Sequence, residues 1–138
     1  MLDEPAAAFT PRGDAPVIVT DQGFAADDWS GRVVDLAPDS DIRELAADLP
    51  QNALIRVAFP GFADGRGFTI ARRLRLAGYT GRLRAAGHVI ADQYAMARRS
   101  GFDEVEISAD LARRQPWEQW QERSHWQGGY LPRLGWQG

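Results

Sequence analysis

The chain contains neither cysteine nor lysine among its 138 residues. The lack of cysteine excludes disulfides, thiol nucleophiles, cysteine-held iron–sulfur clusters and zinc–thiolate sites. The lack of lysine excludes Schiff-base chemistry on a lysine of this chain. All 16 basic residues are therefore arginine, which reflects either a GC-rich genome that favours arginine codons or anion recognition by guanidinium groups. We favour the codon explanation.

Other features that are scarce limit the location and the partners of the protein. No apolar run approaches the roughly 20 residues that cross a bilayer, and the first residues have no basic region before an apolar block. We therefore expect a cytoplasmic protein with no membrane partner. Only two histidines occur, His88 and His125, far apart in sequence, so we predict no metal site. The net charge of −3 and the lack of a basic block argue against a nucleic-acid partner.

The length and composition indicate one domain. Hydrophobic residues make up 44% and charged residues 25%, which is typical of a soluble globular protein. We predict a loose N-terminal segment over 1–16, an α/β domain over 17–126 and a C-terminal tail over 127–138. Because the tail is apolar at several positions, we expect it to be packed or to lie at an interface.

Strand and helix patterns alternate along the domain. Strands are expected over 16–20, 32–37, 53–58, 81–87 and 103–107, with a loop over 21–29. Helices are expected over 41–49, 68–77 and 88–100, and from 108 onward with a break at Pro116. Alternation of this kind is typical of βαβ crossovers. The sequence thus predicts a single α/β domain with a mainly parallel sheet of four or five strands. An open sheet is preferred, a partial barrel is the alternative, and strands 53–58 and 82–86 should be parallel neighbours.

The stretch FPGFADGRGFT, residues 59–69, is the most distinctive loop of the chain. It follows an apolar strand and precedes a helix, and ligands bind outside the carboxyl ends of parallel strands. The loop after the next strand belongs to the same edge. The predicted anion-binding residues are Asp64, Gly65, Arg66, Gly67 and Thr69, and the predicted supporting residues are His88, Asp92 and Gln93. The pattern is neither a dinucleotide fingerprint nor a Walker loop, so no nucleotide or other cofactor is predicted.

Each of these residues also has a purely structural interpretation. The two glycines can permit positive φ in a tight turn, or expose amides at a helix start for an anion. Asp64 can cap the turn rather than take a proton, and Arg66 can form a salt bridge with Asp64 or with Asp92. His88 is a candidate acid or base near neutral pH, or a helix-cap residue at the rim. No residue is assigned a catalytic role.

Aromatic residues gather towards the C-terminus. Trp117 and Trp120 fall on one helical face, and Trp126, Tyr130 and Trp136 follow. Aromatic side chains are enriched both in cores and at interfaces. We expect packing or an interface rather than a stacking platform, and we predict that this region contributes to self-association or to a partner contact.

The motifs resemble a bacterial family called domain of unknown function 934. The resemblance runs from about Val33 to Ile107 and follows the order F-P-x-F-x-D-G-R-G, L-R-A-x-G-D-V, D-Q and R-x-G-F-D. The matching residues are Phe59, Pro60, Phe62, Asp64, Gly65, Arg66, Gly67, Leu83, Arg84, Ala85, Gly87, Val89, Asp92, Gln93, Arg99, Gly101, Phe102 and Asp103. One position departs from the pattern, because His88 stands where the family usually has an aspartate.

The resemblance implies a place in assimilatory sulfur metabolism, because members of that family are described as involved in sulfite reduction. It supplies no reaction. We expect an accessory protein that docks on sulfite reductase components and carries a loop for a small oxyanion. The alternative is a small anion-handling enzyme that uses Asp64, Arg66 and Asp92.

Overall fold

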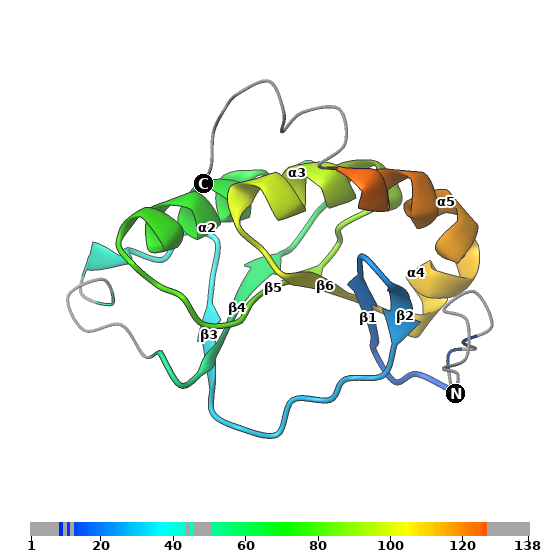
Figure 1. Cartoon of the computed structure of the whole chain (residues 1–138), viewed down its shortest axis with the longest axis horizontal. Coiled ribbons are helices and arrows are strands. Elements are labelled where there is room, and N and C mark those ends of the chain that lie inside the picture. The colour runs from blue at the N-terminus through cyan, green and yellow to red at the C-terminus, as the bar shows by residue number, and fades with distance from the viewer. Residues whose placement is uncertain (1–8, 10, 12, 44, 46–50, 127–138) are drawn as a thin grey trace.

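The computed structural model describes residues 9, 11, 13–43, 45 and 51–126. Its strands form one open sheet in the order β2-β1-β6-β5-β4-β3 (Figure 1). Their bounds are β1 Val17–Thr20, β2 Gly23–Ala25, β3 Val33–Leu36, β4 Leu54–Phe59, β5 Leu83–Gly87 and β6 Glu104–Ile107. Strands β3 to β6 are parallel, whereas β1 is antiparallel to both β6 and β2. The mainly parallel α/β sheet predicted from the sequence is confirmed, and it does not close into a barrel.

The predicted pairing of the two apolar strands is confirmed, but the predicted number of strands is too low. Strands β4 and β5 are parallel neighbours with Ile55 opposite Leu83. Among the described residues the sheet has six strands, because part of the expected loop over 21–29 forms β2. Strand β2 has only three residues, which is too short for an alternation of apolar and polar residues to be recognised in the sequence. A two-residue connection between Thr20 and Gly23 makes a hairpin of β1 and β2.

The helices follow the strands closely along the chain. Their bounds are α2 Arg66–Leu76, η2 Ala91–Gln93, α3 Tyr94–Ser100, α4 Ala109–Arg114, α5 Trp117–Gln121 and η3 Glu122–His125. The predicted break at Pro116 is confirmed, because that residue is the N-cap of α5. The helix predicted from residue 88 begins only at Ala91, since Ile90 is extended. The helix predicted over 41–49 lies largely outside the described residues.

The core lies between the sheet and the helices. Alternate residues of the parallel strands face the helices, among them Ile55, Val57 and Phe59 of β4, and all three are buried. Figure 1 shows α2, α3 and α5 along this side of the sheet. Burying one such side chain contributes about 1.5–3 kcal/mol. None of the described helices is long and apolar enough to cross a membrane.

The tryptophans of α5 belong to this core. Trp120 is fully buried and Trp117 is 7% exposed, and both contact Phe24 of β2 edge-on. The packing role expected for these two residues is therefore observed, and β2 is held in place by it. Trp126 is half-buried, and its ring nitrogen donates to Asp21. Tyr130 and Trp136 lie outside the described residues, so the predicted role in association stays a prediction.

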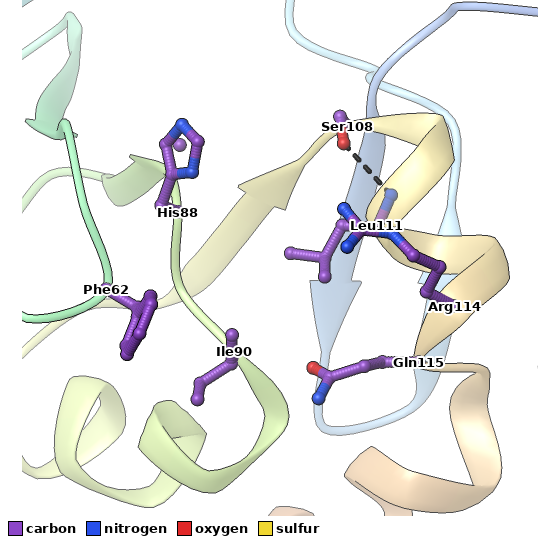
Figure 2. Close-up of a pocket in the computed structure, with 8 residues that line it drawn as sticks. Phe62, His88, Ile90, Ser108, Leu111, Arg114 and Gln115 are labelled. Atoms are coloured by element: carbon purple, nitrogen blue, oxygen red, sulfur yellow. Dashed lines mark hydrogen bonds between the residues drawn. The ribbon is translucent and has the colours of Figure 1, made fainter.

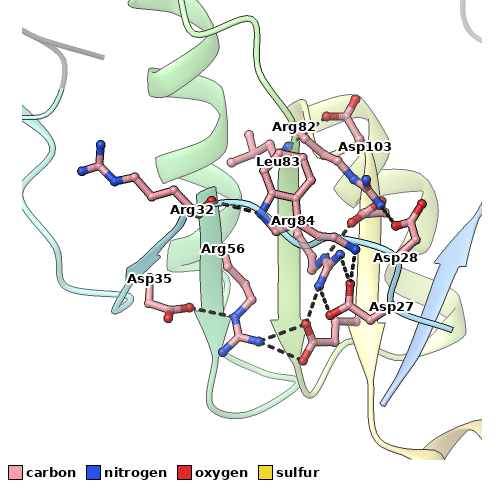
Figure 3. Close-up of polar contacts among 12 residues, drawn as sticks. Asp27, Asp28, Arg32, Asp35, Arg56, Arg82, Leu83, Arg84 and Asp103 are labelled. Atoms are coloured by element: carbon pink, nitrogen blue, oxygen red, sulfur yellow. Dashed lines mark hydrogen bonds and ion pairs between the residues drawn. The ribbon is translucent and has the colours of Figure 1, made fainter. Parts of the chain in front are cut away.

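The opposite face of the sheet carries charged side chains. The intervening positions of β4, β5 and β6 include Arg56, Arg84, Glu104 and Glu106, which form a ladder of ion pairs across the strands (Figure 3). Among the described residues, the connection over 26–32 crosses this face (Figure 1), and its acids extend the ladder. Parallel strands usually carry apolar residues on both faces. This sheet differs, because one of its faces is apolar and the other carries a ladder of ion pairs.

Arg84 is the centre of the ionic ladder and is only 1% exposed. Its Nε donates to Glu104 at 2.6 Å, its Nη1 donates to Glu106 at 2.9 Å, and its Nη2 donates to Asp27 at 2.9 Å. Burial alone would lower the pKa of Arg84, but the hydrogen bonds to Asp27 and Glu104 outweigh it and raise the pKa. The guanidinium is thus buried as a cation with three carboxylates around it.

Candidate functional site

Asp64 and Arg66 form a two-point ion pair at the start of α2. The Nε of Arg66 donates to Oδ1 at 3.0 Å, and its Nη2 donates to Oδ2 at 2.7 Å. The same Oδ1 also accepts from the backbone amide of Arg66, so Asp64 caps the turn as one of its two interpretations expects. The side-chain hydrogen bond lowers the pKa of Asp64 to about 2. The side chain of Arg66 remains more than half exposed, so its guanidinium is accessible to solvent at the N-terminus of α2.

One of the two interpretations of the glycines in this loop is contradicted. Gly65 has φ −92°, and Gly67 is not among the glycines with positive φ, so the expectation of left-handed backbone is wrong for both. Gly67 is required for close packing, because a Cβ there would lie 2.5 Å from the ring of Phe59. Its lack of a side chain lets α2 approach β4, which is a structural role.

The other predicted residues divide between two places. Asp92 faces η3, where Arg123 donates to its carboxylate at 2.5 Å, so the predicted contact of Asp92 with the Arg66 loop is absent. Gln93 does reach that loop, since its Nε2 donates to the carbonyl of Phe62 at 2.5 Å. Thr69 is exposed on α2. The structure therefore brings only part of the predicted constellation together.

A depression of about 600 Å³ opens at the carboxyl ends of the parallel strands (Figure 2). One wall comes from the segments that follow β4 and β5, and the other comes from α4 and its cap, which follow β6. Its lining residues are Phe62, Gly87, His88, Ile90, Ser108, Leu111, Arg114 and Gln115. The predicted location of a site at this edge thus coincides with the concave surface, although most of its lining residues were not predicted.

Two glutamine side chains fix the walls of the depression. Gln93 accepts from the amide of Ile90 while it donates to Phe62, which ties the loop after β4 to the segment after β5. Gln115 accepts from the amide of Ala91 at 2.9 Å, which ties the end of α4 to the same segment. Phe62 is nevertheless 61% exposed, an unusual position for a phenylalanine on an anchored loop.

The sequence contained a signal for one of the missed residues. Ser108 directly follows β6 and caps α4, because its Oγ accepts from the amide of Leu111 at 3.0 Å. A serine three residues before an apolar position at a strand end is a typical helix start. Arg114 and Gln115 had no comparable signal, since only the fold brings the end of α4 against the segment that follows β5.

The fold and this depression define an open-sheet α/β protein whose concave surface lies at the carboxyl ends of its parallel strands. A family model matches residues 33–133, which is most of the chain. The chain belongs to this family, which is described as bacterial protein of unknown function (DUF934). The resemblance predicted from the loop motifs is confirmed. No curated protein and no solved structure matches the chain.

Proposed function

We propose that this protein is a non-catalytic accessory of assimilatory sulfite reduction that docks on a sulfite reductase component. The sulfite-reduction context comes from the resemblance of the loop motifs, and the docking surface comes from the depression. The observation that carries the docking proposal is Phe62, which is 61% exposed on a loop held by Gln93. A rigid exposed aromatic residue beside a concave surface is the kind of group that dominates binding at protein interfaces.

The charged groups near the loop also support binding rather than catalysis. Asp64 is engaged by Arg66, and Asp92 is engaged by Arg123. Each carboxylate therefore already serves as the partner of an arginine. His88 is exposed, and its backbone amide is used to join β5 to Phe59. These contacts favour a preformed surface over a set of groups poised for proton transfer.

The docking proposal predicts that Phe62→Ser weakens binding to purified sulfite reductase by about tenfold or more, because central aromatic contacts commonly contribute over 1.4 kcal/mol. The measurement is biolayer interferometry with each reductase component immobilised in turn. Leu76→Ser is the matched control, since Leu76 is 83% exposed at the end of α2 and does not line the depression. Lack of binding by the wild type, or equal binding by both variants, would contradict the proposal.

The second candidate is an oxyanion site at Arg66. The observation that favours it is that Arg66 is oriented by Asp64 yet exposes 58% of its side chain at the first residue of α2. The hydrogen bond to Asp64 and the charge of Asp64 raise the pKa of Arg66, so the guanidinium is always charged. A fixed guanidinium of this kind suits sulfite, sulfate, phosphate or a carboxylate.

For this second candidate we expect Arg66→Ala to abolish sulfite and sulfate binding. Arg66→Lys should weaken it, because an ammonium group keeps the charge but loses the planar fork. Isothermal titration calorimetry with both anions measures the effect, and thermal unfolding of each variant checks that the fold is kept. Arg43→Ala is the control, since Arg43 forms a similar exposed pair with Asp41. If Arg66→Ala binds anions as the wild type does, the Asp64–Arg66 pair is only structural.

A further inference from the structure

The depression is lined by hydrogen-bond donors and apolar groups. Its apolar part consists of Phe62, Ile90 and Leu111, and its polar side chains are those of His88, Ser108, Arg114 and Gln115. None of the eight lining residues is an acid, although the whole protein has 19 acids and a net charge of −3. The depression therefore lacks the negative charge that is common elsewhere on this chain.

Some polar side chains that line the depression have hydrogen-bond donors that are not used within the protein. The Oγ of Ser108 accepts from Leu111, which leaves its hydroxyl hydrogen, and the Oε1 of Gln115 accepts from Ala91, which leaves its NH₂ group. Within the described part of the chain these two donors have no protein acceptor. Arg114 makes one ion pair, with Asp110 at 3.1 Å, and its side chain is 68% exposed. A guanidinium has five N–H donors, so Arg114 can serve a second acceptor.

Apolar and polar groups lie on both sides of the depression. Figure 2 shows Phe62 and Ile90 on one side, with His88 above them, and Leu111, Arg114 and Gln115 on the other side. A ligand that fills this space needs an apolar body for the apolar groups and oxygen acceptors for the donors. A carboxylate satisfies the donors best, since charge-assisted hydrogen bonds are the stronger ones.

We infer that the depression binds a partner segment in which a bulky apolar side chain stands beside carboxylates. This inference rests on the proposed docking function and names the chemistry of the docked segment. The walls are held by Gln93 and Gln115, so little reorganisation is needed when the segment binds. A second copy of the charged sheet face does not fit, because the apolar part of the depression would remain empty.

The test uses the full chain and three blocked tripeptides as probes. The first is acetylated, amidated glutamate–phenylalanine–glutamate, the second replaces both glutamates by glutamine, and the third replaces phenylalanine by alanine. Binding is followed by two-dimensional NMR of the ¹⁵N-labelled protein. We expect the first peptide to shift the amide signals of Phe62, His88 and Leu111 and to bind about tenfold more tightly than each of the other two.

Two variants show whether Arg114 supplies the preference for carboxylates. Arg114→Gln should remove most of the difference between the glutamate and glutamine peptides. Arg113→Gln should keep it, because Arg113 is the neighbouring arginine of α4 but does not line the depression. Equal binding of the two peptides, or an unchanged preference in Arg114→Gln, would overturn the inference. Phenylacetate that binds as tightly as the first peptide would also overturn it, in favour of a small-molecule site.

The outcomes separate this inference from the proposed function. If the peptide results are as expected but sulfite reductase does not bind, the sulfite-reductase proposal fails and the depression recognises the acidic apolar segment of another protein. If the reductase binds through Phe62 but the peptides show no preference for glutamate, the inference about carboxylates fails and the docking function stands.

Discussion

Arg84→Met is expected to lower the free energy of unfolding by about 3 kcal/mol, the lower end for a broken buried pair, because Glu104 and Glu106 then keep only their contacts with Arg82 and Arg56. Glu104 is 3% exposed and loses the 2.6 Å hydrogen bond from Arg84 Nε. Glu106 and Asp27 lose their contacts with the same guanidinium. Methionine fills much of the volume of the arginine stem, so the lost charge rather than a cavity dominates the change.

Urea denaturation followed by circular dichroism measures this effect. Arg43→Met is the matched control, because Arg43 also forms a short ion pair with an aspartate but is 89% exposed. We expect that control to leave the denaturation midpoint nearly unchanged, since exposed pairs contribute little. If Arg84→Met loses no more stability than Arg43→Met, the prediction is wrong, and water replaces the Arg84 guanidinium at no cost in free energy.

A double variant examines the origin of the Arg84 effect. Arg84→Met combined with Glu104→Leu removes both members of the closest pair and replaces them by apolar groups. It should recover part of the stability lost in Arg84→Met, because replacing a whole buried pair is often close to neutral. If the double variant is less stable than Arg84→Met, then packing of the arginine stem dominates instead.

Gly87→Ala is expected to be the second strongly destabilising change. Gly87 has φ +123°, and a Cβ there would lie 2.5 Å from the carbonyl oxygen of Phe59. That oxygen accepts the backbone hydrogen bond from His88 at 2.9 Å, so the clash would push β4 and β5 apart at their carboxyl ends. We expect a loss of about 1–3 kcal/mol from the backbone conformation. The steric conflict should add about 1–3 kcal/mol.

Gly78→Ala separates the two contributions. Gly78 has φ +105°, and a Cβ there would meet no atom within 4 Å. It should therefore lose only the conformational part, and urea denaturation should place it between the wild type and Gly87→Ala. Equal losses of stability in Gly87→Ala and Gly78→Ala would mean that β4 and β5 move apart at no cost in free energy, and would contradict the predicted steric contribution. Because Gly87 lines the depression, Gly87→Ala should also disturb the signals of His88 in the NMR experiment.

The parallel part of the sheet and the family could both be predicted from the sequence alone. Strand β4 is a mostly apolar run, β6 alternates charged and apolar residues, and β4, β5 and β6 are each followed along the chain by a helix. These are local patterns, and a local pattern is enough to place a strand or a helix. For the same reason the break at Pro116 could be predicted, whereas β2 is too short to have a pattern.

The sequence also pointed to the edge of the sheet at which the depression opens, but to only one of the residues that line it, His88. The ion pair of Asp64 with Arg66 joins positions two apart and was among the predicted alternatives. The partner of Asp92 is 31 positions away, and no local rule selects Arg123. Arg114 and Gln115 reach the depression only because the fold brings the end of α4 against the segment that follows β5.

The ionic character of one sheet face depends on contacts between residues that are distant in sequence. Arg84 and Glu104 are 20 positions apart, and they pair because the register of β5 and β6 places them opposite each other. The charges at alternate positions were visible in the sequence, but alternate charges are also found on strands that face water. The register of neighbouring strands determines which charges meet, and the segment over 26–32 determines that Arg84 is buried among them.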